Sequence, residues 1–460
     1  MMSVEEASIS DTVLRRLVGF VATCRARPLN EAQTQAMTLR LTDAMACALL
    51  AVGSADFAAL RARFADDTGA CTIIGGGGRA SLEHAAFLNV FLVRQHDWND
   101  TYIGKNGGHP SDLIGGALAA GEYAGKSGAD VLQGIAIGTH VMLDLCDAAS
   151  ALARGWDPST YLGIASSVSA GVLLDLTDMQ LAHAISMTTV SGNMLMGRVG
   201  KVSSWKGLSS AAAVRNSIFN ALLAKSGMSG PDPVFEGDFG FIKHISGDMS
   251  LELDAARDRT ADTHLKFYPA VYHGQGPIES CLRLHGEIAA MLGVSSIAAL
   301  IESVEIDIYE FALRYAADTP DKWAPGNVET ADHSLPFLAA HCLVTGEFGP
   351  GSIEHTLKNA DVLALTRKVK VRGDAAFSAQ WPRLTPSRVT VAAAGRTFQA
   401  EVEAIKGHPM RPLTPDDVFA KFMSCATPLA GEADARLWAQ RLSDLDRLPQ
   451  ISLALRAPSR

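Results

Sequence analysis

The sequence has few of the residue spacings that build metal centres or disulfide frameworks. Its seven cysteines are odd in number and lie far apart, and no pair has the Cys-x-x-Cys spacing. The histidines show neither the His-Glu-x-x-His nor the His-x-His pattern. We therefore expect reduced thiols in the protein core. We expect no zinc site, no iron–sulfur cluster and no other cofactor.

Signals for export, membrane insertion and nucleic-acid binding are also missing. Residues 1–7 contain no basic segment followed by an apolar one, which a secretory signal would require. No uninterrupted apolar run approaches the roughly 20 residues of a membrane span. The net charge is −9, and no basic patch is interleaved with aromatic residues. We predict a cytoplasmic protein that binds neither a membrane nor nucleic acid.

The first half of the chain has the periodicity of helices. Apolar residues recur at helical spacing over residues 40–50, 159–174, 179–196 and 209–225. Many interior positions are Ala, Gly or Ser, which lets helices pack closely. Another helix should begin with Pro110 near its first turn, and Ser111 and Asp112 are its candidate capping residues. This half therefore predicts an all-α domain.

After about residue 270 the pattern changes to alternation with a period of two. Strands are predicted at 304–308, 368–371, 388–391 and 398–402, with helices at 277–292 and 334–344. Helical spacing returns at Thr414, which stands three residues before Asp417 as in a capping box. The predicted fold is mainly α. A large all-α domain comprises residues 1–270 and 411–460, and a smaller α+β lid domain, 271–410, is inserted before the C-terminal helices.

The most informative stretch is polar and lies between apolar segments. Residues 95–101 read Gln-His-Asp-Trp-Asn-Asp-Thr, and residues 107–112 read Gly-Gly-His-Pro-Ser-Asp. They follow the apolar run 85–93 and precede a helix rich in Ala and Gly. Burying so many polar groups costs free energy unless they are hydrogen-bonded or used in function. The stretch therefore predicts an active-site turn.

Several separated motifs, in the family's order along nearly the whole chain, resemble the MmgE/PrpD family. Their forms are most similar to the 2-methylcitrate dehydratase branch and less similar to the cis-aconitate decarboxylase branch. The motifs are Asp97-Trp98-Asn99-Asp100-Thr101, Gly108-His109-Pro110-Ser111-Asp112, Gly155-Trp156-Asp157, Ser204-Trp205-Lys206-Gly207, Gly227-Met228-Ser229-Gly230-Pro231, Tyr268-Pro269-Ala270-Val271-Tyr272-His273-Gly274-Gln275 and Thr330-Ala331-Asp332-His333-Ser334-Leu335-Pro336.

The resemblance implies a helical domain with an α/β lid, a homodimer, and activity without a metal. It implies a lyase that dehydrates a 2-methylcitrate-like tricarboxylate in propionate metabolism. The chain departs from the branch at Pro158, Gly274 and Phe337, where the branch usually has His, Ser and Tyr. Two of these changes remove polar groups that could touch a substrate, so the substrate is left open.

Dehydration of a hydroxy tricarboxylate needs a base, an acid and cations that hold carboxylates. We assign the acid–base and clamping roles to Asp97, His109, Lys206 and His273, and expect them to converge on one pocket. His109 precedes a helix start, where an anion is favoured, and Lys206 is a carboxylate clamp or acid. The expected substrate-binding residues are Asn99, Thr101, Arg198, Lys201, Tyr272 and Gln275.

Each of these residues also has a plain structural interpretation. Asp97 could cap its own turn, His109 could be a core histidine, and Lys206 could be a surface lysine. Asp100 is equally well interpreted as a supporting acid, and His333 as a residue that holds the lid. Three functions remain open: a dehydratase, an epimerase, racemase or decarboxylase with the same pocket, or a carboxylate-binding member without catalysis.

Overall fold

The computed structural model describes residues 9–197 and 203–457. The chain divides into two compact units. The helical unit comprises Met1–Thr263 and Thr414–Arg460, and the α+β unit comprises His264–Leu413. The fold is mainly α, as predicted, with the α+β unit inserted before the C-terminal helices. Two two-residue hairpins in the helical unit were not predicted: β1 (Cys71–Thr72) with β2 (Arg79–Ala80), and β3 (Tyr102–Ile103) with β4 (Gly107–Gly108).

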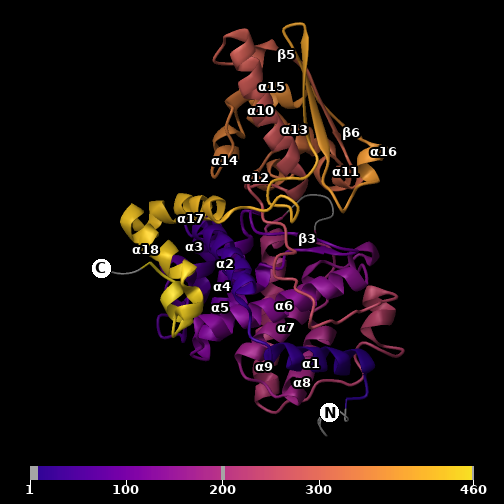
Figure 1. Cartoon of the computed structure of the whole chain (residues 1–460), viewed down its shortest axis with the longest axis vertical. Coiled ribbons are helices and arrows are strands. Elements are labelled where there is room, and N and C mark those ends of the chain that lie inside the picture. Colours follow the sequence, from indigo (N-terminus) through magenta and orange to yellow (C-terminus); the bar gives the residue numbers. More distant parts are fainter. Residues whose placement is uncertain (1–8, 198–202, 458–460) are drawn as a thin grey trace. The chain divides into compact units, whose positions relative to one another are not determined.

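The helical unit packs helix on helix around one large apolar core. In Figure 1 the C-terminal helices α17 and α18 lie beside α2, although they are far from it in sequence. The helices of this unit are α1 (Thr12–Arg25), α2 (Glu31–Ala51), α3 (Ala55–Phe64), α4 (Leu82–Arg94), α5 (Asp112–Tyr123), α6 (Gly128–Ala148), α7 (Ser159–Leu173), α8 (Asp178–Ser191), α9 (Trp205–Lys225), α17 (Pro415–Ala430) and α18 (Glu432–Ser443).

Small residues set the distances between these helices. A methyl group added at Gly115 of α5 would lie 2.6 Å from the Val90 backbone nitrogen of α4. One added at Gly138 of α6 would lie 3.1 Å from the Ala165 carbonyl oxygen of α7. The close packing expected from the Ala, Gly and Ser content is therefore present. By length and composition α6 could cross a membrane, but 83% of its apolar window is buried inside the protein.

Gly128, the first residue of α6, provides a test of this packing. Its backbone N–H donates to the Leu448 carbonyl oxygen over 2.9 Å, and an added methyl group would lie 1.7 Å from the Leu445 carbonyl oxygen. A backbone carbonyl cannot move aside as a flexible side chain can. We expect Gly128→Ala to lower the free energy of unfolding by about 1–3 kcal/mol or more in urea denaturation. At Gly53 an added methyl group meets nothing within 4 Å, so an equal loss in Gly53→Ala would contradict the packing argument.

The α+β unit is a four-stranded sheet with the order β6-β5-β7-β8, where β5 and β6 are parallel and the other pairs antiparallel. Side chains alternate between buried and half-buried along β7, as expected for a sheet with one covered face. Helices α10 and α13 pack against the sheet and against each other. The strands are β5 (Ile301–Ile308), β6 (Val369–Gly373), β7 (Ser387–Ala393) and β8 (Arg396–Val402); the helices are α10 (Gln275–Leu292), α11 (Glu310–Ala316), α12 (Val328–Ala331), α13 (Leu335–Thr345), α14 (Ser352–Thr356), α15 (Ala360–Thr366) and α16 (Ala375–Ser378).

Candidate active site

The candidate site is built on the turn that follows α4. The helix ends at Arg94, and the Asp97 backbone N–H donates to the Arg94 carbonyl oxygen over 3.2 Å. Asp97 has a φ of 52°, in the left-handed region that strains any residue with a side chain, although aspartate tolerates it better than most. Its side chain is buried. Backbone strain of this kind is concentrated at functional sites, so a buried and strained acid points to function.

Asp97 is paired with a fully buried arginine. Arg94 Nη1 donates to Asp97 Oδ1, and Arg94 Nε lies 3.8 Å from Asp112 Oδ2 at the start of α5. Burial alone would lower the pKa of Arg94, but attraction by Asp97, Asp112 and Asp157 outweighs it and raises this pKa. The guanidinium therefore stays charged beside Asp97. Asp157 belongs to the Gly-Trp-Asp motif, and its charge also acts on Arg94.

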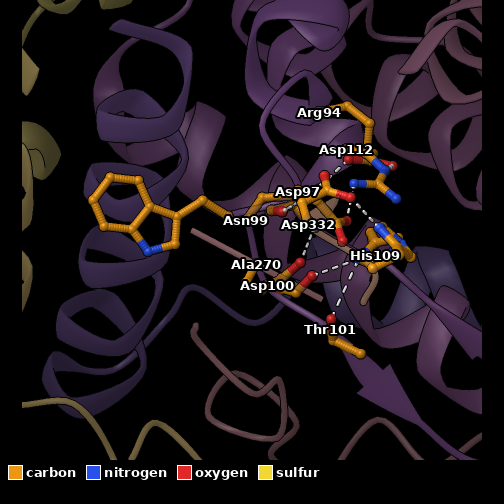
Figure 2. Close-up of polar contacts among 12 residues, drawn as sticks. Arg94, Asp97, Asn99, Asp100, Thr101, His109, Asp112, Ala270 and Asp332 are labelled. Carbon is orange, nitrogen blue, oxygen red and sulfur yellow. Dashed lines mark hydrogen bonds and ion pairs between the residues drawn. The ribbon is translucent and has the colours of Figure 1, made fainter. Parts of the chain in front are cut away.

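Polar side chains tie the turn to the start of α5. Asn99 Nδ2 donates to Ser111 Oγ over 3.0 Å and to Asp112 Oδ1 over 2.8 Å, and the Ser111 backbone N–H donates to Asp100 Oδ1 over 2.9 Å. Figure 2 shows Arg94, Asp97, Asn99 and Asp112 meeting in one small region. Ser111 occupies the N-cap position of α5, as predicted, but its hydroxyl accepts from Asn99 and makes no capping hydrogen bond.

His109 is presented by the β3–β4 hairpin, in which Tyr102 pairs with Gly108. Its Nδ1 lies 2.7 Å from the Asp100 carbonyl oxygen and 3.4 Å from Thr101 Oγ1. A carbonyl oxygen only accepts, so Nδ1 carries a proton and donates it to this bond. In a neutral ring the proton on Nδ1 leaves the lone pair on Nε2. Figure 2 shows this contact beside the Asp97 turn.

The structure brings together Asp97, Asn99, Thr101 and His109 of the predicted site. The amide nitrogen of Asn99 is used within the turn, while its Oδ1 is buried and accepts no hydrogen bond from the part of the chain that the structure describes. That oxygen can accept from a bound molecule. Contact of Asn99 and Thr101 with a substrate stays a prediction.

Lys206 lies in the first turn of α9 and is buried. A methyl group added at the neighbouring Gly207 would lie 3.6 Å from both Gln95 Oε1 and Phe91 Cε2. The start of α9 is therefore packed against the end of α4, close to where the Asp97 turn begins. The predicted cations Arg198 and Lys201 lie outside the described residues.

A second buried ion pair, between Lys421 and Asp43, is bonded to the turn through Trp98. Lys421 of α17 donates to Asp43 Oδ1 of α2 over 2.7 Å and to the Trp98 carbonyl oxygen over 2.9 Å. Its ammonium also lies 4.4 Å from the centre of the Trp98 ring, at a cation–π distance. Helix α17 thus holds Trp98, the residue next to Asp97. Neither Asp43 nor Lys421 was among the predicted site residues.

The remaining predicted residues belong to the α+β unit. His273 is buried, and its Nδ1 lies 2.7 Å from the Tyr309 hydroxyl oxygen. The Tyr272 hydroxyl lies 2.6 Å from His264 Nδ1. Convergence of His273 with Asp97, His109 and Lys206 stays a prediction.

Gln275 has a structural use within the α+β unit. Its Oε1 accepts from the backbone N–H groups of Phe267 and Tyr268, and its Nε2 donates to the carbonyl oxygens of Tyr268 and Ala270. The amide therefore holds the loop 267–270. Its contact with a substrate stays a prediction, and the same holds for Tyr272.

The three departures from the expected motifs lie at structural positions. Pro158 stands at the N-cap of α7, and Phe337 is fully buried in α13 within the core of the α+β unit. A methyl group added at Gly274 would lie 2.9 Å from Leu338 Cδ1. A serine there would require Leu338 to move, so the glycine fits this core.

Among the residues that sequence reasoning missed, Arg94 had a recognisable signal. It ends the apolar run Phe-Leu-Val-Arg at 91–94, directly before the polar turn. A charged residue that continues a buried helical face is rarely tolerated without a partner. The acids at 97 and 112 could have been proposed as those partners.

Comparison with known proteins covers both units. The model of the MmgE/PrpD N-terminal domain matches residues 15–254, and that of the MmgE/PrpD C-terminal domain matches residues 268–446. The 2-methylcitrate dehydratase of Salmonella typhi is 27% identical over 319 residues, or 65% of this chain and 64% of that enzyme. The mitochondrial 2-methylcitrate dehydratase of Yarrowia lipolytica is 27% identical, over 64% of this chain and 59% of that enzyme.

A relative with a different named activity matches less of the chain. The cis-aconitate decarboxylase-like protein oryM of Aspergillus oryzae is 28% identical over 52% of both chains. In each of these three relatives the match spans less than two thirds of the relative's own length. The two domain models nevertheless cover most of this sequence, in the order that the motifs predicted. The chain belongs to the MmgE/PrpD family.

Proposed function

We propose that this protein is a hydro-lyase that dehydrates a hydroxy tricarboxylate of the 2-methylcitrate type. Family membership and the named activity of several relatives support this. One structural observation carries the proposal: the Asp100 carbonyl holds His109 in the same turn region as the buried Arg94–Asp97 pair. Such an arrangement suits removal of a proton from carbon.

The proposed reaction breaks two bonds on neighbouring carbons. A base removes the proton from a carbon that bears a carboxylate, and the electrons of that C–H bond form a carbon–carbon double bond. The hydroxyl leaves the adjacent carbon and takes up a proton, so that the products are an unsaturated tricarboxylate and water. In this proposal His109 or Asp97 is the base, and His273 serves the departing hydroxyl. Lys206 holds a carboxylate through a charge-assisted bond, and Arg198 and Lys201 add positive charge.

An epimerase, racemase or decarboxylase could begin from the same pocket, because proton transfer beside a carboxylate is common to these reactions. Decarboxylation is the second candidate, because one relative is named as cis-aconitate decarboxylase-like. A carboxylate-binding protein without catalysis is the third.

The test is a panel of hydroxy di- and tricarboxylates, including 2-methylcitrate and citrate, incubated with the full chain. We expect ultraviolet absorbance from a conjugated double bond to rise with a tricarboxylate and not with malate. The rate should survive prolonged treatment with a chelator, because the proposed chemistry needs only side-chain acids and bases. Thermal stabilisation by tricarboxylates without any product would instead identify a binding protein. Loss of activity on chelation with recovery on adding a metal would contradict the proposed cofactor-free mechanism.

We also propose a homodimer in the cytoplasm, with a small carboxylate as its ligand and neither nucleic acid nor membrane as a partner. The dimer rests on the family resemblance and on small-residue helices that can pack against a second chain. A stable monomer in light scattering at micromolar concentration would contradict the dimer.

A further inference from the structure

His273 is enclosed by aromatic rings of the α+β unit. The centres of the Tyr309, Phe311 and Trp381 rings lie 5.6, 5.8 and 5.6 Å from the centre of the imidazole, and Tyr315 stacks on it at 5.9 Å. Trp381 is itself stacked on Tyr309, with ring centres 4.1 Å apart and an angle of 12° between the planes. This packing leaves the imidazole little freedom to turn.

The Tyr309 hydroxyl makes the directed contact in this enclosure. Tyr309 follows the last residue of β5, its side chain is 1% exposed, and its hydroxyl oxygen lies 2.7 Å from His273 Nδ1. Within residues 9–197 and 203–457, His273 is the only hydrogen-bond partner of this hydroxyl. Burial, reinforced by the neighbouring Tyr272, raises the pKa of Tyr309 well above its usual value, so the hydroxyl keeps its proton.

The direction of the bond follows from the cost of burying an unsatisfied donor. If His273 Nδ1 donated to the Tyr309 oxygen, the phenolic O–H would be left buried without an acceptor, at a cost of about 1–3 kcal/mol. If Tyr309 donates, its proton is satisfied and Nδ1 supplies the lone pair. The second arrangement is favoured, and in a neutral ring it places the proton on Nε2.

We propose that Tyr309 is a positioning residue that holds neutral His273 in its Nε2–H form, as a hydrogen-bond donor to an oxygen of the substrate. His109 has the opposite form, because its Nδ1 donates to the Asp100 carbonyl. The two histidines are therefore held in different ways: a backbone carbonyl holds Nδ1 of His109, and a tyrosine hydroxyl holds Nδ1 of His273, so that His273 can present an N–H to a carboxylate or hydroxyl oxygen. The task given to His273 rests on the proposed function, whereas its tautomer does not.

The tautomer can be measured without substrate. In long-range proton–nitrogen NMR spectra of the full chain with nitrogen-15-labelled histidine, taken above the ordinary histidine pKa of about 6.5, each ring shows which nitrogen carries the proton. His273→Gln assigns the signals of residue 273. We expect His273 to have a protonated Nε2 and a bare Nδ1. In Tyr309→Phe this preference should be lost and the signals should move toward a mixture of tautomers.

Tyr315→Phe is the matched control, because it removes a hydroxyl from a ring stacked on the same imidazole without changing the bond at Nδ1. The His273 signals should keep the wild-type pattern there. A protonated Nδ1 in the wild type would overturn the proposal, and so would an unchanged tautomer in Tyr309→Phe. If that variant does not fold, the wild-type spectrum alone still decides.

A second measurement separates this inference from the proposed function. On the tricarboxylate found in the panel, Tyr309→Phe should lower kcat by about 10-fold or more, since a wrong tautomer disables a catalytic histidine. An unchanged kcat would contradict the positioning role. If the wild type dehydrates nothing, the proposed function fails while the NMR result on Tyr309 stands.

Discussion

Replacing His109 with glutamine should lower kcat for dehydration by about 100-fold or more, which is the usual contribution of a positioned general base. Glutamine can still donate a hydrogen bond to the Asp100 carbonyl, so the hairpin should keep its conformation. It cannot take up a proton, so the chemical step should fail. The measurement is the initial rate of product absorbance at saturating tricarboxylate, with circular dichroism as the check on folding.

His84→Gln is the matched control for this prediction. His84 lies near the start of α4, at the opposite end of the helix from the Asp97 turn, and contacts the Phe64 ring. The same substitution there should leave kcat within a factor of about two, because surface substitutions away from the site have small effects. Equal activity of the His109 and His84 variants would remove His109 from the mechanism.

Asp97→Asn complements the histidine variant, since asparagine also tolerates a positive φ. The variant keeps the backbone of the turn and removes the Asp97 charge, while the charges of Asp112 and Asp157 near Arg94 remain. A loss of kcat without unfolding would assign the effect to that charge. Asp67→Asn, at an exposed position of the same unit, controls for the substitution itself.

The largest effect on stability is expected at Lys421. Its side chain and that of Asp43 are 4% and 0% exposed, and Lys421→Met would leave the Asp43 carboxylate buried without its partner. Breaking a buried pair in this way costs about 3–5 kcal/mol. The measurement is the free energy of unfolding in urea. Arg436→Met is the control, because the Arg436–Glu432 pair is mostly exposed and should contribute at most about 1 kcal/mol.

The pH dependence of the Lys421→Met variant distinguishes charge from packing. Burial raises the pKa of Asp43 even with Lys421 present. In the variant the folded state holds the Asp43 proton more tightly than the unfolded state, whose pKa is about 3.9. The variant should therefore lose stability relative to wild type as pH rises above the raised pKa that Asp43 has in the folded wild type. A deficit that does not change with pH would mean that lost packing, not the unpaired carboxylate, is responsible.

A double variant tests the same pair in another way. Asp43→Asn combined with Lys421→Met contains no buried charge at this position. It should be more stable at neutral pH than Lys421→Met alone, because the unpaired carboxylate is gone. Equal stability would contradict the assigned cost.

Local patterns predicted much of the fold because the physical causes are local. The alternation at 304–308 became part of β5, and the hairpin around Gly395 became β7 and β8. Thr414 and Asp417 form the predicted capping box. The helix expected from residue 209 begins four residues earlier, at Trp205. Gly207 and the serines that follow have weak helix propensity, so the first turn depends on packing against α4.

The polar network of the site could be predicted only in part. The motif placed Asp97, Asn99 and His109 in one stretch of sequence, and the structure keeps them together. By contrast, Lys421 and Asp43 are 378 residues apart, and no local rule pairs them. The same holds for Tyr309 and His273, which are 36 residues apart. Ser111 is an intermediate case: it occupies the N-cap position that the local rule predicts, but its hydroxyl accepts a longer-range hydrogen bond from Asn99 and makes no capping bond.

The most direct test of the central claim is proton NMR of the wild-type chain with 2-methylcitrate in deuterated water. The proposed function predicts that the substrate signals decline while those of an unsaturated tricarboxylate grow by the same amount. Recovered substrate that carries deuterium on carbon, with no unsaturated product, would identify an epimerase and contradict dehydration. A product that has lost carbon dioxide would contradict it in favour of a decarboxylase.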